Sequence, residues 1–281
     1  MSEPSRTTPA AYAAPTSQAR VTVPGLHTMA RDGVPIAMLT CYDASFAAVC
    51  ERAGVDVLLI GDSLGNVIQG RSSTIPVTLD DVLYHTRCVA AGAQRALVIT
   101  DLPIGTYQES REQAYRSCVA AMQAGAHMCK MEGGAWLAPT VEFVVARGIP
   151  VCGHVGLLPQ FVHAYGGYRV QGKGEAAAAV LRADAHAISD AGAALIVVEC
   201  VPRALVATLA SEVKAPLIGI GAGPDCAGQV LVIYDVLGIQ PGRAARFVRN
   251  FAKGAGSIED AIAAYVRAVK QREFPAAEHC F

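Results

Sequence analysis

The stretch AGVDVLLIGDS, residues 53–63, contains the repeating unit that predicts the fold. Gly54 stands where a preceding helix would end, as glycines at helix carboxyl ends do. The apolar run after it is rich in Leu, Val and Ile, which is typical of a strand buried on both faces. Asp62 and Ser63 follow where the run stops. The unit is therefore a helix-to-strand turn, a buried strand, and polar side chains at the carboxyl end of the strand.

This unit recurs along the chain, with glycine turns at AGAQR, AGAHM and AGAAL. Apolar runs predict strands at 36–43, 56–62, 96–101, 127–132, 150–155, 194–200, 216–221 and 230–236. Helical patterns lie between them at 44–54, 78–92, 111–124, 140–147, 174–191 and 203–212. Two more helical patterns, 243–253 and 258–270, follow the last strand. The helix at 78–92 begins at Thr78 with Asp81 three residues on, which approximates a capping box.

The alternation of strands and helices predicts an α/β protein with a (β/α)8 TIM barrel. A doubly wound open sheet is the alternative, but no GxGxxG follows the first strand. No change of composition divides the chain, so we expect one barrel domain over residues 23–281, with a C-terminal helical extension. Residues 1–22 are rich in Ser, Thr, Ala and Pro, and we expect them to form a disordered tail.

Composition excludes several classes of function. The 281-residue chain has a net charge of -1 and no basic run, which argues against nucleic acid as a partner. No apolar run approaches the roughly 20 residues that span a bilayer, and the N-terminal segment lacks the apolar core of a signal peptide. The nine cysteines include no CxxC pair. We therefore expect reduced thiols in a cytoplasmic protein, with an organelle transit peptide as the weaker alternative.

Three carboxylates end three consecutive predicted strands: Asp62, Asp101 and Glu132. Adjacent strands lie about 5 Å apart, so these groups can converge. They would repel one another unless a cation lies among them, and oxygen ligands without His or Cys favour Mg²⁺ over zinc. For any single carboxylate, capping of the next helix is the alternative role.

Three further side chains accompany this predicted metal site. Lys130 lies two residues before Glu132 and therefore on the same side of the strand, where it can stabilise negative charge; a Schiff base is the competing role. His154 ends the fifth strand, and an ordinary core histidine is the alternative. Glu199 ends the sixth, away from the acidic cluster, and can act as the base on a carbon acid. Alternation predicts that the neighbouring Cys129 and Cys200 point outward to the helices.

Two glycine-rich stretches are weaker signals. IGIGAG, residues 218–223, ends the seventh strand, where barrels often bind phosphate; its glycines also permit a tight turn or the close approach of a flat ligand. HAYGGYRVQGKG, residues 163–174, follows the fifth strand and is a candidate for a mobile lid over the site.

Taken in order, these segments resemble the ketopantoate hydroxymethyltransferase family, from about residue 25 to the C-terminus. The resemblance is carried by GDSLGNVIQGRSSTIPVTLDDVLYHT, AGAHMCKMEGG, PVCGHVGLLPQ, GGYRVQGKG and IGIGAG. The family belongs to a wider barrel superfamily with phosphoenolpyruvate mutase and isocitrate lyase. The chain departs from the family pattern at Cys41, Ala44 and Leu158, and family members commonly have Thr at the last of these. None of these positions is an expected metal ligand or the expected base.

The resemblance implies an activity and a set of site residues. Its members transfer a hydroxymethyl group from 5,10-methylenetetrahydrofolate to 3-methyl-2-oxobutanoate, which gives 2-dehydropantoate for pantothenate and coenzyme A synthesis. By this resemblance, Asp62, Asp101 and Glu132 hold Mg²⁺, and Asp62, Ser63, Asp101 and Lys130 bind the 2-oxo acid. Glu199 matches the catalytic base and His154 a pocket histidine that we assign to substrate binding. A homodecamer is also implied.

Two rivals stay open at this stage. Another Mg²⁺-dependent 2-oxo acid lyase or mutase of the same superfamily would share the carboxylates, although a lyase would usually add a loop cysteine that we do not find near the rim. The second rival is a non-catalytic barrel, which should have lost some of the five charged site residues. All five are present: Asp62, Asp101, Lys130, Glu132 and Glu199.

Overall fold

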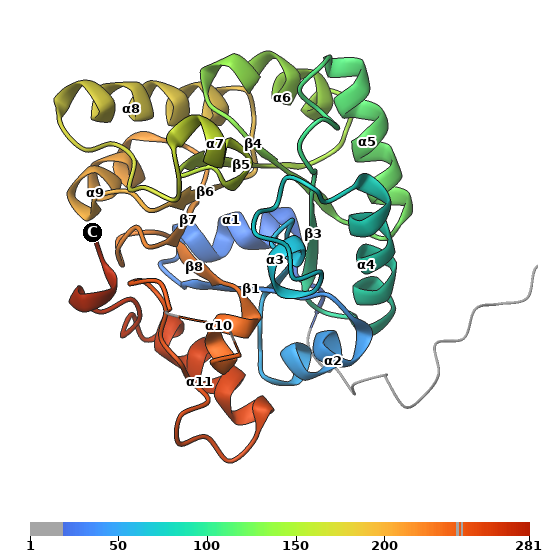
Figure 1. Ribbon diagram of the computed structural model, residues 1–281, viewed down its shortest axis with the longest axis vertical. Coiled ribbons are helices and arrows are strands. Elements are labelled where there is room, and N and C mark those ends of the chain that lie inside the picture. Colours follow the sequence, from blue (N-terminus) through green and yellow to red (C-terminus); the bar gives the residue numbers. More distant parts are fainter. Residues whose placement is uncertain (1–18, 240–241, 243) are drawn as a thin grey trace, which may run out of the picture.

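The computed structural model describes residues 19–239, 242 and 244–281, and Figure 1 shows their arrangement. Eight parallel strands form a closed barrel in the order β1 to β8, so the predicted (β/α)8 fold is confirmed. The strands are β1 Ile36–Thr40, β2 Val57–Ile60, β3 Leu97–Asp101, β4 Met128–Glu132, β5 Val151–Gly156, β6 Leu195–Glu199, β7 Leu217–Ile220 and β8 Gly228–Leu231.

Most of the α-helices lie around this barrel (Figure 1). They are α1 Val23–Arg31, α2 Ala44–Arg52, α3 Leu64–Val67, α4 Leu79–Gly92, α5 Arg111–Gln123, α6 Ala138–Val145, α7 Val162–Tyr165, α8 Glu175–Asp190, α9 Arg203–Glu212, α10 Ile233–Leu237 and α11 Ile258–Lys270. Short 3-10 turns occupy Ala135–Leu137, Pro159–Phe161 and Ala277–His279. The capping box predicted at Thr78 and Asp81 is present at the start of α4.

The barrel closes where β8 pairs with β1, with Met38 opposite Val230. A Cβ atom on Gly228 would collide with the backbone oxygen of Ile36. Glycine at this position therefore lets the first and last strands approach closely enough to pair. The hydroxyl of Tyr265, on α11, donates to the backbone oxygens of Met38 and Gln229 and so fastens that helix across the same junction.

Helix α1 covers the amino-terminal end of the barrel. His27 Nε2 lies 2.8 Å from the oxygen of Ala194, which precedes β6. Just before the helix, the Val21 N–H donates to the oxygen of Arg95, which precedes β3. Since α1 lies at the amino ends of the strands, their carboxyl ends are left for a site.

The prediction for the eighth strand was wrong in its extent. We expected a strand over 230–236, but β8 ends at Leu231 and residues 233–237 form α10. In α10, Ile233, Val236 and Leu237 are buried on one helical face. A short apolar run of this kind does not by itself distinguish a strand from a buried helix.

The helix predicted at 243–253 was also wrong, since the described residues of that segment form turns and extended chain. The side chain of Asn250 accepts hydrogen bonds from the backbone N–H groups of Ala252 and Lys253, which favours a turn there. Phe251 is buried against the rings of Tyr265 and Phe274. Tertiary packing thus fixes an irregular segment whose composition suits a helix.

Helix α1 was missed, although Thr22 caps it and Pro24 lies in its first turn. Most of the tail predicted to be disordered, residues 1–18, lies outside the described residues. No helix in the described part of the chain is long and apolar enough to cross a membrane. All nine cysteines are free thiols.

Candidate active site

A cavity of about 630 Å³ opens at the carboxyl ends of the barrel strands. Every residue assigned to the site from the sequence lines it: Asp62, Ser63, Asp101, Lys130, Glu132, His154 and Glu199. Side chains brought together from β2 to β6 therefore face one space, as expected for the carboxyl rim of a barrel.

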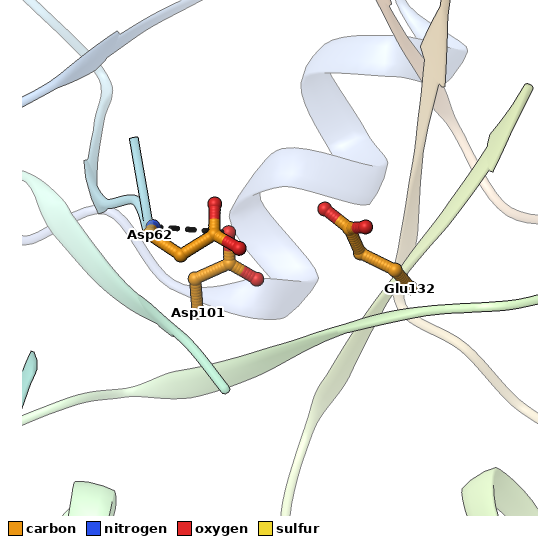
Figure 2. A group of neighbouring side chains, drawn as sticks. All are labelled: Asp62, Asp101 and Glu132. Atoms are coloured by element: carbon orange, nitrogen blue, oxygen red, sulfur yellow. Dashed lines mark hydrogen bonds between the residues drawn. The ribbon is translucent and has the colours of Figure 1, made fainter. Parts of the chain in front are cut away.

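The three carboxylates form one buried cluster (Figure 2). Asp62 follows β2, while Asp101 and Glu132 are the last residues of β3 and β4. Each offers one oxygen such that all three oxygens lie within 4.8 Å of one another. This spacing suits a single hard cation held by oxygen ligands.

Lys130 supplies one positive charge to this cluster. Its Nζ lies 2.6 Å from Asp101 Oδ2 and 3.4 Å from Glu132 Oε1. Although burial opposes its charge, the carboxylates of Asp101 and Glu132 raise the pKa of Lys130 above its usual value, so the side chain is an ammonium. One ammonium does not balance three carboxylates.

The excess of negative charge and the burial of the cluster affect the pKa values of the carboxyl groups. Burial, and then the nearby Glu132, raise the pKa of Asp62 to about 6. Burial also raises the pKa of Asp101 against the opposing effect of Lys130. Asp101 Oδ1 is buried and has no hydrogen-bond partner among the described residues. A divalent cation among the three carboxylates would satisfy this oxygen and offset the repulsion, so the residues present fit Mg²⁺.

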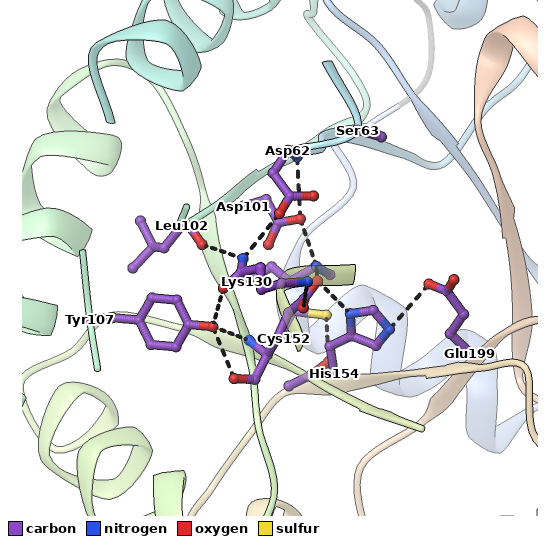
Figure 3. Close-up of polar contacts among 12 residues, drawn as sticks. Asp62, Ser63, Asp101, Leu102, Tyr107, Lys130, Cys152, His154 and Glu199 are labelled. Atoms are coloured by element: carbon purple, nitrogen blue, oxygen red, sulfur yellow. Dashed lines mark hydrogen bonds and ion pairs between the residues drawn. The ribbon is translucent and has the colours of Figure 1, made fainter. Parts of the chain in front are cut away.

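His154 lies between the acidic cluster and Glu199 (Figure 3). Its Nδ1 is 3.2 Å from Glu132 Oε1, and its Nε2 is 3.3 Å from Glu199 Oε2 without hydrogen-bond geometry. Burial and the neighbouring Lys130 ammonium lower the pKa of His154. Because an ionised Glu132 can only accept, a neutral His154 donates from Nδ1 and turns its Nε2 lone pair toward Glu199.

Two polar residues that support the cluster were not predicted from the sequence. Gln160 donates from Nε2 to Asp62 Oδ2 at 3.1 Å and from its backbone N–H to Glu132 Oε2 at 3.1 Å. The Tyr107 hydroxyl donates to Gln160 Oε1 at 2.7 Å. Gln160 follows a proline in the PVCGHVGLLPQ motif. Neither Gln160 nor Tyr107 ends a strand, so the search for polar residues at strand ends, which found the carboxylates, did not find them.

Comparison with known protein families matches residues 20–277 to ketopantoate hydroxymethyltransferase. A 3-methyl-2-oxobutanoate hydroxymethyltransferase of Azoarcus sp. is 59% identical over 262 residues, which cover 93% of this chain and 97% of the relative. The chain belongs to the ketopantoate hydroxymethyltransferase family. A second family member, 3-methyl-2-oxobutanoate hydroxymethyltransferase 1 of Burkholderia ambifaria, is 58% identical over 96% of this chain and 99% of its own length.

Solved structures of other proteins share the barrel fold of this family member. A putative phosphonomutase from Burkholderia cenocepacia has a TM-score of 0.63 at 17% identity and covers 77% of this chain and 95% of its own. 2,3-Dimethylmalate lyase, a phosphoenolpyruvate mutase/isocitrate lyase superfamily member, has a TM-score of 0.50 at 16% identity over 70% of each chain. At such identities the likeness shows the barrel fold alone.

The remaining sequence predictions for this family member have mixed outcomes. Cys129 packs outside the barrel among the helices, as predicted. Cys200 lines the cavity instead, because the strand ends at Glu199 and Cys200 has a φ of 49°, so strand alternation no longer applies. From the glycine-rich stretches, Tyr168, Val170 and Ile220 reach the cavity, whereas Arg169 and Lys173 are not among its lining residues.

Proposed function

We propose that the protein transfers a hydroxymethyl group from 5,10-methylenetetrahydrofolate to 3-methyl-2-oxobutanoate and so forms 2-dehydropantoate. The observation that carries this proposal is the buried Asp62, Asp101 and Glu132 cluster with Lys130 beside it and Glu199 facing the same cavity. A cation site next to a carboxylate base is what the deprotonation of a 2-oxo acid at C3 requires. The names of the family relatives agree with this chemistry.

The acidic cluster would hold Mg²⁺ through Asp62, Asp101 and Glu132. When bound, the ion supplies Lewis acidity that polarises the 2-oxo group and makes the C3 proton more acidic. We propose that the carboxylate and oxo oxygens of the substrate lie toward Lys130 and Ser63, which line this side of the cavity. The Ser63 hydroxyl lies 2.9 Å from the Tyr42 hydroxyl, which holds it in place.

Glu199 then acts as the base. Its carboxylate takes the C3 proton, and the Lys130 ammonium stabilises the negative charge that develops on the enolate oxygen. The protonated Glu199 can donate its new O–H to the Nε2 lone pair of His154, which lies 3.3 Å away. His154 in this way holds the proton near Oε2 while C3 reacts.

The second half of the reaction builds a carbon–carbon bond. C3 of the enolate bonds to the methylene carbon of the folate, the two bonds from that carbon to the folate nitrogens N5 and N10 break, and a water molecule provides the hydroxyl oxygen. The two nitrogens take up the proton held by Glu199 and the second proton of the water, and tetrahydrofolate leaves. We further propose, from family membership, that the enzyme works in the cytoplasm as a homodecamer. We also propose a single barrel domain over residues 23–281, although Val21 and Thr22, which the sequence assigned to the tail, already contact it.

The test is proton exchange at C3 of 3-methyl-2-oxobutanoate in D₂O, followed by NMR with and without Mg²⁺ and tetrahydrofolate. We expect Mg²⁺-dependent loss of the C3 proton signal, and formation of 2-dehydropantoate when methylenetetrahydrofolate is added. Absence of exchange under every condition would sink the proposal. The rival function, a lyase or mutase on another 2-oxo acid, predicts turnover that needs no folate.

A further inference from the structure

The cavity extends beyond the acidic cluster to a second region. Its lining there comes from the ends of β7 and β8, from α10 and from the C-terminal segment: Ile220, Val230, Leu231, Val232, Asp235, Ala245, Phe247 and Phe281. In a closed eight-strand barrel the end of β8 lies across the rim from β4, which carries Lys130 and Glu132. A five-carbon oxo acid held at the acidic cluster would leave this apolar region for another molecule.

Asp235 is the acidic residue of this second region. Within the described part of the chain, no hydrogen bond or ion pair involves its side chain, and burial alone raises its pKa to about 6. A carboxylate that is desolvated without a partner costs folding free energy. The Asp235 carboxylate is thus a hydrogen-bond acceptor that faces the cavity and is available to a bound molecule.

Flat aromatic walls lie in the same region. A Cβ atom on Gly221 would lie 3.0 Å from Phe247 Cδ1 and 3.1 Å from Phe281 Cε2, so both rings pack against this glycine. Gly221 has a φ of 60°, which glycine adopts without strain. The guanidinium carbon of Arg246 lies over the ring of Phe281, 5.4 Å from the ring centroid. A planar heterocycle fits rings held in this way.

We propose that Asp235 binds the one-carbon donor by accepting hydrogen bonds from the 2-amino group and the ring N–H of its pterin. This inference rests on the proposed function. The two donors lie side by side on one edge of a pterin and match the two oxygens of a carboxylate, as the N–H groups of a guanidinium do. The apolar walls would bury the faces of the ring, and the methylene carbon would reach the oxo acid from the β8 side.

The experiment compares wild-type enzyme with Asp235→Asn and with the control Asp190→Asn, whose exposed aspartate pairs with Lys214. Asparagine keeps one acceptor but turns an amide donor toward the donors of the pterin. Loss of a charge-assisted hydrogen bond predicts a rise in KM for methylenetetrahydrofolate of about 10- to 100-fold. The KM for 3-methyl-2-oxobutanoate should change far less, and the control should match wild type in both.

A donor analogue sharpens the assignment. Wild type should discriminate against 2-desamino-2-methyl-methylenetetrahydrofolate, and Asp235→Asn should lose most of that discrimination. C3 exchange of the oxo acid, which needs no donor, reports whether the variant retains a folded site. An unchanged donor KM in a variant that still exchanges overturns the inference, and so does a parallel loss of exchange and donor affinity. A wild-type enzyme that shows neither exchange nor product would instead contradict the proposed function.

Discussion

His154 places its Nε2 3.3 Å from Glu199 Oε2, at the edge of the cavity where the base must act. Its other ring nitrogen lies 3.2 Å from Glu132 Oε1, so one imidazole connects the proposed base to the proposed metal cluster. Both His154 and Glu132 are buried, whereas the Glu199 side chain retains 14% of its exposure. One side of the base therefore faces a ring nitrogen that can accept a hydrogen bond once Glu199 is protonated, and the other side is open to the substrate.

Replacement of His154 by leucine should slow C3 exchange by about 100-fold, because a small displacement of a reacting group has an effect of that size. The KM for the oxo acid should change little. His154→Gln, which keeps a polar side chain beside the two carboxylates, should recover part of the rate. Exchange at the wild-type rate in His154→Leu would contradict a positioning role.

Glu199→Gln should abolish exchange and turnover while it preserves binding. The amide is nearly the same size but cannot take a proton, and general-base catalysis contributes about 10²- to 10⁴-fold. Calorimetric titration should show Mg²⁺ and 3-methyl-2-oxobutanoate binding near wild-type affinity. Retained turnover would remove Glu199 from the base role.

Mg²⁺ should stabilise the folded protein, since a ligand that binds only the folded state raises the free energy of unfolding by mass action. Thermal unfolding in EDTA and in increasing Mg²⁺ should show a rising Tm for wild type. Asp101→Asn should remove most of this dependence because it alters the carboxylate whose Oδ1 has no hydrogen-bond partner among the residues that the structure describes. Asp190→Asn, which changes an exposed ion pair with Lys214, should behave as wild type. A metal response in Asp101→Asn equal to that of wild type would argue against the site.

Gln160→Leu should weaken Mg²⁺ binding by about 10- to 100-fold, the usual effect of removing a residue that orients metal ligands. The side chain holds Asp62, and its backbone N–H holds Glu132. Tyr107→Phe removes the hydroxyl that donates to Gln160 and accepts from the Glu132 N–H, but it leaves the contacts of Gln160 with both carboxylates in place and should have a smaller effect. Equal Mg²⁺ affinity in Gln160→Leu and wild type would show that Asp62 does not need this contact.

The sequence predicted what strand periodicity and strand ends determine, and little of what tertiary packing determines. Asp62, Asp101, Lys130 and Glu132 were found because buried parallel strands bring their carboxyl ends together, whatever the exact boundaries. Cys200 was misplaced because alternation was extended one residue past the end of β6. No local pattern distinguished α10 from a strand, since Ile233, Val236 and Leu237 are apolar in either case.

The supporting contacts of the site were beyond sequence reasoning for a related reason. Gln160 reaches Asp62 across 98 positions of the chain, and only the closed barrel makes that contact. The sequence predicted Asp235 as part of a strand over 230–236. Its position at the cavity became clear only from the structure, in which it lies on α10.

Asp235→Asn should make the folded protein more stable near neutral pH. The folded-state pKa of Asp235 is raised from 3.8 to about 6, so ionisation is easier in the unfolded chain. The resulting penalty is absent below the unfolded pKa, grows as pH rises from 3.8 toward 6, and stays constant above that. Since each pKa unit corresponds to about 1.4 kcal/mol, the variant should gain up to about 3 kcal/mol at neutral pH.

Urea unfolding of wild type and Asp235→Asn across this pH range measures the difference in the free energy of unfolding. The difference in the free energy of unfolding between variant and wild type should decrease as pH falls through 6 toward 3.8. Over this range the wild-type carboxyl becomes protonated first in the folded and then in the unfolded state. Asp190→Asn should show no such trend, since its aspartate is exposed beside Lys214. A gain in stability together with a loss of donor affinity is the pattern expected of a residue kept for binding. A variant less stable than wild type at neutral pH would indicate that Asp235 instead supports α10.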